Sequence, residues 1–419
     1  MTWPVVSLND LQADEPRAIT DGPFGSNLAS RHYTDQGPCV VRLQNIGDGR
    51  FVEGDAHISE KHFESLRAHE VRAGDLLVAS LGEVLPRACL APTSLGPAIV
   101  KADCIRVRLR SDVDPRWVLY SMQRPEVRRW ADDHRHGVGR PRLGLKVIRQ
   151  IPIPLPPLDE QRRIVDLLED HLSRLDAAET YLAAAAQRAD SMRWRAADTA
   201  VARAGGTEVR LGDIANVRNG IFVSRPGSQP NGVPILRIGA IRPLSLDLGD
   251  LRYSERTESD LDDADGLLLS GDIVFTRYNG NPRFVGACAV VPSDAPALTY
   301  PDKLMRVRLL DAEALPSFVA LACSVGGARA SIQASVRTTA GQAGISGRDL
   351  KAVSLRLPDM ESQMAAVAAT NESGAAAGRL ISEIERARRR GAAVRRSLLA
   401  AAFSGRLPVA LTEGVSILS

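Results

Sequence analysis

The side chains of this sequence that could do recognisable chemistry are arginine, asparagine, glutamine and tyrosine residues in short polar loops. The stretch from Arg277 to Arg283 holds the strongest cluster, because two arginines flank Tyr278 and Asn279, and a glycine favours a protruding turn. Such side chains bind the base edges of nucleic acids, whereas cations on phosphates set only position. This loop therefore has the composition expected of a segment that contacts nucleic acid.

Candidates for such contacts, which also include one serine and one threonine, are found in both halves of the chain. In the first half of the chain the candidates are Ser26, Arg42, Asn45, Arg87, Arg135, Arg140 and Arg142. In the second half they are Arg225, Arg237, Arg277, Tyr278, Asn279, Arg283, Thr339 and Gln342. For any one arginine the alternative is a solvated side chain or an intramolecular ion pair, and Arg42 and Arg237 could simply be strand-face residues. The stretch from Arg124 to Arg149 holds eight basic residues against three acidic ones, which is a phosphate-binding patch or a solvated face.

The sequence contains no motif that indicates catalysis or metal binding. The sequence has neither a phosphate-binding loop of the form G-x-x-x-x-G-K-[ST] nor an Asn-Pro-Pro-Tyr-like methyltransferase motif. His134 and His136 flank Arg135, but two histidines without a cysteine nearby make poor metal ligands. We therefore predict no catalytic residue, no metal ion and no cofactor bound by this chain.

Composition is that of a soluble globular protein with more than one domain. The chain has 419 residues, with 44% hydrophobic and 25% charged residues and a net charge of only +3, so total charge identifies no partner. The five cysteines form no C-x-x-C pair, which favours reduced, mostly buried thiols. No signal peptide and no apolar run near the roughly 20 residues of a membrane span is present. We expect a cytoplasmic protein without a membrane partner.

A long helix from Leu155 to Arg203 is the element that must position the loops. The segment runs for more than forty residues without glycine or proline once Pro156 and Pro157 are passed, and Gly205-Gly206 ends it. Apolar or small residues recur at alternating steps of four and three, which predicts a coiled-coil seam. The predicted seam residues are Ile164, Leu168, His171, Leu175, Ala178, Leu182, Ala185, Ala189 and Met192. At about 1.5 Å per residue the helix would be roughly 65 Å long.

This helix occurs a second time in the chain. Pro156 and Gln161 are matched by Pro358 and Gln363, in both cases 202 residues later. The second seam is predicted at Leu380, Ile384, Ala387, Val394, Leu398 and Ala401. A chain that holds two such units consists of two related halves.

The globular segments repeat in the same order. Ile105–Leu109 alternates as a half-buried strand would, and Met305–Leu309 repeats it. The turn and strand at Ala73–Ala79 recur at Ser270–Thr276, and the loop around Phe24 recurs around Phe222. We therefore predict an α+β protein with an internal pseudo-two-fold repeat: a first mixed α/β domain at 1–154, a long helix at 155–205, a second similar domain at 206–357, and a long antiparallel helix with a tail at 358–419.

The sequence resembles the specificity subunits of type I restriction-modification systems over nearly its whole length. The motifs that support the resemblance are Gly22-Pro23-Phe24-Gly25-Ser26, Gly74-Asp75-Leu76-Leu77, Gly271-Asp272-Ile273-Val274, Ile153 to Gln161, and Thr339 to Ile345. The resemblance implies a non-catalytic subunit with two target recognition domains, each reading one half of a bipartite DNA sequence, spaced by two antiparallel helices. It also implies two methyltransferase partner subunits with S-adenosylmethionine, and a motor nuclease (restriction) subunit that uses ATP and Mg²⁺.

Some residues depart from the family pattern. Glu361-Ser362 replaces the usual acidic pair before Gln363, and the segment from Asn371 to Gly378 brings poor helix formers into the second helix, which allows a kink or a frayed turn.

Two alternative functions remain open from the residues alone. One is a stand-alone DNA methyltransferase or nuclease with its own recognition domain, and the other is a coiled-coil adaptor that binds proteins. A DNA reader differs from an adaptor because its affinity falls steeply with salt.

Overall fold

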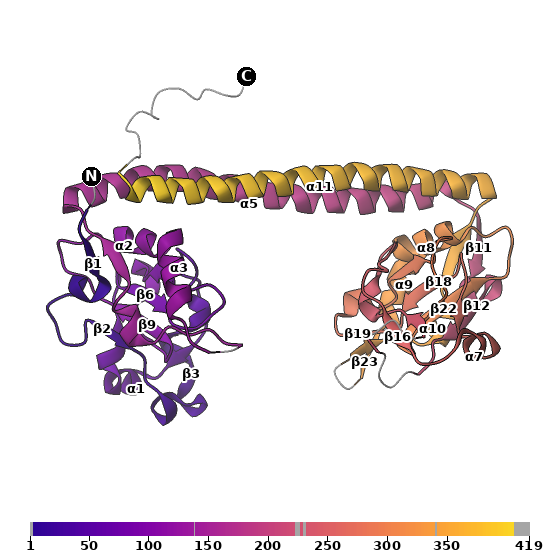
Figure 1. The fold of residues 1–419 in the computed structure, drawn as a ribbon. Coiled ribbons are helices and arrows are strands. Elements are labelled where there is room, and N and C mark those ends of the chain that lie inside the picture. Colours follow the sequence, from indigo (N-terminus) through magenta and orange to yellow (C-terminus); the bar gives the residue numbers. More distant parts are fainter. Residues whose placement is uncertain (1–2, 138, 223–226, 229–231, 340–341, 406–419) are drawn as a thin grey trace, which may run out of the picture. The chain divides into compact units, whose positions relative to one another are not determined.

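The computed structural model describes residues 3–137, 139–222, 227–228, 232–339 and 342–405 (Figure 1). The chain forms two compact units. Unit 1 comprises the residues up to Leu182 together with the chain from Arg386 onward, and unit 2 comprises Ala183–Glu385. Among the helices that the structure describes, none has the length and apolar character needed to cross a membrane.

Unit 1 has a mixed α/β globular part. Its strands are β1 (Val5–Ser7), β2 (Ile19–Asp21), β3 (Tyr33–Val41), β4 (His57–Ile58), β5 (Glu70–Val71), β6 (Leu76–Ala79), β7 (Arg87–Leu90), β8 (Ala98–Val100), β9 (Cys104–Val107) and β10 (Pro152–Pro154). Its short helices are α1 (Glu60–Ser65), α2 (Pro115–Met122), α3 (Pro125–His134) and α4 (Leu145–Ile148). The strands pair in the orders β2-β9-β6-β7, β4-β3-β8-β5 and β1-β10.

Unit 2 has the same kind of globular part with more hairpins. Its strands are β11 (Thr207–Arg210), β12 (Ala215–Asn219), β13 (Val233–Ile235), β14 (Ile241–Arg242), β15 (Ser245–Leu246), β16 (Arg252–Ser254), β17 (Leu267–Leu268), β18 (Ile273–Thr276), β19 (Tyr278–Asn279), β20 (Cys288–Val290), β21 (Leu298–Thr299), β22 (Leu304–Leu309), β23 (Arg337–Thr339), β24 (Gln342–Gly344) and β25 (Ser354–Leu357). Its short helices are α6 (Leu211–Ile214), α7 (Glu258–Asp263), α8 (Pro316–Ser324), α9 (Gly326–Ala334) and α10 (Gly347–Lys351).

The two globular parts share one topology, which confirms the predicted internal repeat and fold class. The sheet β2-β9-β6-β7 corresponds to β12-β22-β18-β20, and the sheet β4-β3-β8-β5 corresponds to β16-β13-β21-β17. In each second sheet one pair of strands is parallel, with Val40 opposite Ile99 in unit 1 and Ile235 opposite Thr299 in unit 2. Matching strand orders with matching directions are the mark of a duplicated fold.

The repeated Gly-Asp motif closes an equivalent turn in each unit. Gly74 and Gly271 have positive φ angles of 83° and 85°, where a glycine is favoured. The Oδ2 atom of Asp75 accepts a hydrogen bond from the Arg72 backbone N–H at 2.7 Å, and that of Asp272 accepts one from the Leu269 N–H at 2.7 Å. Each carboxylate also binds an arginine, Arg108 directly after β9 in unit 1 and Arg308 in β22 in unit 2. The motif is therefore a structural turn that leads into a buried strand.

Both predicted long helices are present. α5 extends over Leu158–Ala204 and α11 over Met360–Phe403. α11 continues without interruption through Gly374 and Gly378, so the frayed turn that these residues allowed is not found. A Cβ at either glycine would meet nothing within 4 Å, so neither residue is required by a neighbour, and the alanine-rich sequence around them sustains the helix.

The helices run antiparallel where they pair in unit 1. Arg388 donates to the Glu179 carboxylate at 2.7 Å, and Arg395 pairs with Asp176. From Arg388 to Arg395 the chain moves forward along α11, while the paired residue on α5 moves back from Glu179 to Asp176. The two helices therefore run antiparallel here. In unit 2, small residues at the end of α5, including Ala200, pack into the same apolar cluster as Ala366 of α11.

The predicted coiled-coil seam is only partly correct. Ile164 and Leu168 are 2% and 0% exposed, as predicted. Met192, Leu380 and Val394 are instead 68%, 50% and 47% exposed, and Ala178 is also exposed. A straight helix drifts about 20° per heptad from a strict seven-residue repeat, so a fixed seam turns toward solvent. The ends of α5 also pack on the globular parts, where Leu172 is buried in the core and the predicted Leu175 is partly buried against it.

The end of α11 completes the core of unit 1. Phe403 is 7% exposed, and its ring centroid lies 4.3 Å from that of the fully buried Trp117 on α2. Leu399 and Ala402 join the same cluster. The last turns of the helix are therefore part of the hydrophobic core that α2 and α5 form.

The cysteines are free thiols, as predicted. Cys89, Cys104, Cys288 and Cys323 are buried, and Cys39 is half-buried. Burial raises the pKa of Cys89, Cys104 and Cys288 to about 12, so these thiols stay protonated and unreactive.

Candidate nucleic-acid interface

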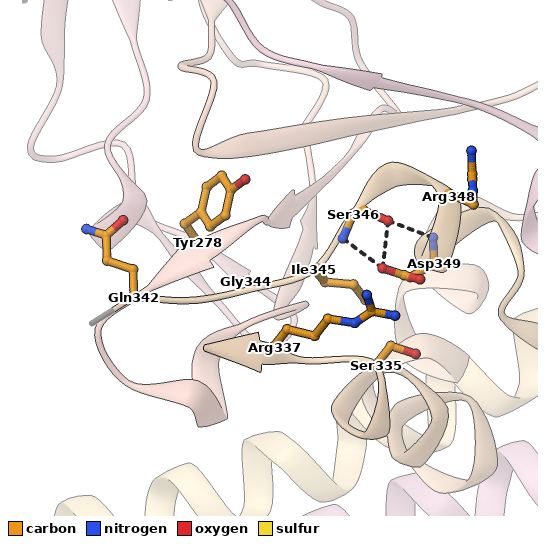
Figure 2. Close-up of a pocket in the computed structure, with 9 residues that line it drawn as sticks. All are labelled: Tyr278, Ser335, Arg337, Gln342, Gly344, Ile345, Ser346, Arg348 and Asp349. Carbon is orange, nitrogen blue, oxygen red and sulfur yellow. Dashed lines mark hydrogen bonds between the residues drawn. The ribbon is translucent and has the colours of Figure 1, made fainter. Parts of the chain in front are cut away.

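A small antiparallel ribbon brings several predicted residues of unit 2 together. The strands β19, β24 and β23 form a three-stranded sheet, with Gly344 of the middle strand opposite both Tyr278 and Arg337. Gln342 begins the middle strand, two residues from Gly344, so its side chain projects on the same face of the ribbon. A cleft of about 580 Å³ opens at this ribbon (Figure 2). Its lining residues are Tyr278, Ser335, Arg337, Gln342, Gly344, Ile345, Ser346, Arg348 and Asp349.

Tyr278 is held as a wall of this cleft. The Arg277 guanidinium lies 4.7 Å from the centroid of the tyrosine ring, within the range of a cation–π contact. The Arg277 Nη1 atom also donates to the Asp302 backbone carbonyl at 3.2 Å. Arg277 therefore supports the ring in addition to contributing positive charge.

Two arginines that sequence reasoning missed set the charge of the cleft. Arg337 and Arg348 are exposed and line it. The opposing carboxylate, Asp349, accepts hydrogen bonds from the Ser346 hydroxyl at 2.6 Å and the Ser346 N–H at 3.2 Å (Figure 2). The hydroxyl hydrogen bond lowers the pKa of Asp349 most, against burial, with the backbone hydrogen bond and the two arginines adding to the effect. Two cations against one carboxylate leave the cleft positive, a property that suits an anionic ligand.

The loop that follows β19 is stiffened by its own asparagines. The Asn279 Oδ1 atom accepts from the Asn281 N–H at 2.9 Å, and the Asn281 Oδ1 atom accepts from the Arg283 N–H at 3.1 Å. Arg329 of α9 donates to the Arg283 carbonyl at 2.6 Å. Within the described part of the chain the exposed Arg283 side chain has no partner, so its cation faces solvent. The loop displays a cation from a fixed backbone.

Unit 1 gathers the predicted residues Arg135, Arg140 and Arg142 at the equivalent place, between α3 and α4. Here the ribbon is reduced to single bridges, in which Arg142 lies opposite both Leu81 and His136. Arg142 is paired with Asp103 at 2.6 Å, and Arg135 with Asp132 at 3.3 Å. Arg140 is exposed, and no hydrogen bond or ion pair joins it to the residues that are described.

Four other candidates brace loops inside the chain. Asn45 is 1% exposed; its Oδ1 atom accepts from the Arg42 N–H at 2.8 Å, and its Nδ2 donates to the Val52 carbonyl at 2.9 Å. Arg87 donates to the Leu43 carbonyl at 2.9 Å. Arg42 is paired with Asp55, and Arg237 with Asp250, at equivalent positions of the two units. Because these polar groups are used internally, we do not include the four residues in the proposed interface.

The remaining candidates are Ser26, Thr339 and Arg225. Ser26 is exposed in a 3-10 turn at Gly25–Leu28. Thr339 ends β23 opposite Gln342. Arg225 lies outside the described residues.

Comparisons with known proteins agree with this architecture. Residues 96–184 match a family model described as the type I restriction modification DNA specificity domain. The chain is 34% identical over 275 residues to the type I restriction enzyme EcoKI specificity subunit of Escherichia coli (strain K12), covering 61% of this chain and 58% of that subunit. It is 23% identical over 392 residues to the type I restriction enzyme StySPI specificity subunit of Salmonella potsdam, covering 88% and 82% of the two chains. The chain is thus similar in sequence to type I restriction specificity subunits.

The fold of this chain is also found in a solved structure of a type I restriction-modification system. The two chains superpose with a TM-score of 0.70 at 17% identity, covering 97% of this chain and 98% of the other. The segment that matches the family model, residues 96–184, contains the Arg135 to Arg142 hairpin and the first half of α5. The alignment with the E. coli subunit spans little more than half of that relative's length.

Proposed function

We propose that this chain is the non-catalytic, sequence-specific DNA-binding subunit of a type I restriction-modification complex. Unit 1 and unit 2 each read one half of a bipartite target in double-stranded DNA. The single observation on which the proposal rests is the duplicated topology that presents different polar ribbons from equivalent positions, between α3 and α4 in unit 1 and between α9 and α10 in unit 2.

Different residues of the ribbons are suited to phosphate contacts and to base contacts. The exposed cations Arg140, Arg283, Arg337 and Arg348 are suited to phosphates, because they carry charge on flexible stems. Tyr278 and Gln342 are suited to base edges, because they present an aromatic surface and an amide donor–acceptor pair. Different residues at the two ribbons give the two units different preferred sequences.

Partner subunits would bind the long helices. Met192 on α5 and Leu380 and Val394 on α11 expose apolar side chains, and in unit 2 a groove of about 520 Å³ between the two helices is lined largely by alanines. We assign these surfaces to two methyltransferase subunits, which direct modification with S-adenosylmethionine. Restriction subunits that use ATP and Mg²⁺ would join the same complex.

Methylation mapping tests the proposal directly. In cells that express the methyltransferase partners, the intact chain is expected to direct methylation to a bipartite motif that is absent when the chain is deleted. Replacing both Arg277 and Arg283 by alanine should weaken or broaden only one half of that motif. Methylation that is unchanged by deletion of the chain would overturn the proposal.

Methyl transfer by the isolated chain distinguishes a DNA-binding subunit from a stand-alone methyltransferase. The purified chain, incubated with DNA and a labelled methyl donor, is expected to transfer no label until methyltransferase subunits are added. Label transfer by the chain alone would instead assign it the catalytic role.

A further inference from the structure

The cleft of unit 2 lies at a ribbon whose middle strand has a glycine, Gly344, between two larger residues. Arg337, Gly344 and Tyr278 form a row across the three strands, since Gly344 is opposite both other residues. Neighbours in such a row normally fill the sheet surface side by side. With glycine in the centre, the Tyr278 ring lies over the middle strand, and Arg337 and Gln342 line the cleft beside it (Figure 2).

The neighbouring ring, rather than the backbone, requires glycine at this position. Gly344 is not among the glycines with a positive φ angle, so its backbone would accept any residue. A Cβ built on Gly344, however, would lie 2.4 Å from Cδ1 and 2.5 Å from Cε1 of Tyr278. Any side chain here must push the tyrosine ring out of its place.

Unit 1 fills the corresponding position. Its row consists of Leu81, Arg142 and His136, with Arg142 where unit 2 has Gly344. The Arg142 side chain is paired with Asp103 at 2.6 Å. The two units thus differ at this ribbon position, which carries an arginine side chain in one and a glycine covered by a tyrosine ring in the other.

We propose that the cleft beside Tyr278 and Gln342 is the specificity-determining pocket of unit 2 and that it receives the edge of an A·T base pair in the major groove. The proposal rests on the DNA-reading function proposed above. The Gln342 amide offers one donor and one acceptor, which matches adenine N7 and N6–H, and the Tyr278 ring offers an apolar surface for the thymine methyl group. Gly344 acts as a positioning residue, because it allows the ring to stand at the wall of the pocket.

A double-mutant cycle at Gly344 and Tyr278 tests this role. Gly344→Ala should move the ring and reduce preference for the A·T pair at one position by about tenfold or more, the range of a lost base contact. In a Tyr278→Ala background the same glycine substitution should have little further effect, because no ring remains to be displaced. Gly327→Ala is the matched control, because a Cβ there meets nothing within 4 Å and Gly327 has no positive φ angle.

The measurement is the methylated motif in cells that express each full-length variant with its partner subunits, read over a randomised target library. Thermal unfolding of each purified variant checks that the fold is retained. The expected result is a change at one base pair of one half-site, with the other half-site unchanged and overall affinity for random DNA kept. The pocket assignment fails if Gly344→Ala leaves the motif intact, if the changed position prefers G·C, or if the effect persists without Tyr278. Absence of any bipartite motif with the unsubstituted chain would instead overturn the proposed function itself.

Discussion

At the scale of single residues, each unit places an arginine between its two sheets. Arg106 on β9 and Arg306 on β22 are 2% and 1% exposed. Arg306 donates to both carboxylate oxygens of Asp265 at 2.8 Å and to the carbonyl of Leu267, on a strand of the other sheet, at 3.2 Å. Arg106 donates to the Glu70 carbonyl at 2.8 Å and to the Arg17 carbonyl. These arginines tie the two sheets of each unit together.

Replacement of Asp265 by asparagine should destabilise unit 2. The substitution keeps the shape of the side chain but leaves the buried Arg306 guanidinium without its counter-charge, and because the carboxylate is 44% exposed we expect a cost of about 1–2 kcal/mol. The loss of unfolding free energy is measured by chemical denaturation, with hydrogen exchange of the β22 amides as the readout for unit 2. Asp55→Asn, at a carboxylate that is 96% exposed in its pair with Arg42, is the control and should change stability by less than about 0.5 kcal/mol. Equal effects of the two substitutions would contradict the assigned role.

The same carboxylate makes unit 2 sensitive to acid. The hydrogen bond from Arg306 lowers the pKa of Asp265 most, against burial, with the charge of Arg306 and the Arg218 contacts lowering it further. Because the folded-state pKa is depressed, this stabilisation is fully present above the ordinary range of an aspartate and is lost as the pH falls through the folded value. Unfolding curves recorded from pH 5 downward should show this loss in the parent chain and not in Asp265→Asn.

The burial of these arginines could not be predicted from the sequence. The alternation in Met305–Leu309 correctly predicted a strand, but it suggested that the arginines face solvent on a half-buried sheet. Arg306 is buried because carbonyl groups of the second sheet and Asp265 accept its hydrogen bonds, and those partners come from about forty residues earlier in the chain. A pattern within one strand carries no information about such partners.

At the scale of elements, a buried glutamine joins each globular part to the start of a long helix. The Gln161 Oε1 atom accepts from the Asp114 N–H at 2.9 Å, and its Nε2 donates to the Pro156 carbonyl at 2.8 Å. Gln363 does the same with the Leu315 N–H at 2.8 Å and the Pro358 carbonyl at 2.9 Å. The match between these glutamines in the sequence thus reflects a repeated joint. In unit 1 it connects the start of α2 to the long helix α5, and in unit 2 it connects the start of α8 to the long helix α11.

Replacement of Gln363 by alanine should loosen this joint. Gln363 is 0% exposed, so the substitution leaves buried backbone groups unpaired, at a cost of about 1–3 kcal/mol. Hydrogen exchange at the Leu315 amide should accelerate accordingly. Gln187→Ala, at an exposed position of α5 in unit 2, is the control and should leave that amide protected. Unchanged exchange in Gln363→Ala would show that the joint does not depend on this side chain.

The existence of the helices could be predicted, but their contact surfaces could not. Prolines, glycines and composition placed α5 and α11 to within a few residues. The heptad pattern failed at Met192, Leu380 and Val394, because the partner of each helix changes along its length from a globular core to another helix. A periodic pattern assumes one constant partner.

At the scale of the whole molecule, the duplication was the most predictable feature, because three matched segments and two matched helices had to agree in order. The ribbons were the least predictable. Arg337 and Arg348 belong to the cleft only because β23 and α10 meet there, and no spacing in the sequence signals that meeting. Gly344 was noticed only as part of a motif, since its role depends on the ring of Tyr278.

The salt dependence of DNA binding should report on the phosphate contacts of the assembled complex. Binding of the assembled complex to its target should weaken steeply with salt, with a log–log slope proportional to the number of phosphates contacted. Combined replacement of Arg283 and Arg348 by alanine should reduce the slope by about 2 without changing the preferred sequence, since both cations are assigned to phosphates. A slope near zero in the parent complex would favour a protein-binding adaptor.

The closure of the first core by the end of α11 sets an order of events during protein synthesis. Unit 2 is one uninterrupted segment, Ala183–Glu385, so all of its residues have been made while unit 1 still lacks Leu399 and Phe403. The part of the protein that the ribosome begins first is therefore the part that can be completed last. A premature stop codon just before Leu399 would spare the downstream unit and expose Trp117 in the upstream one.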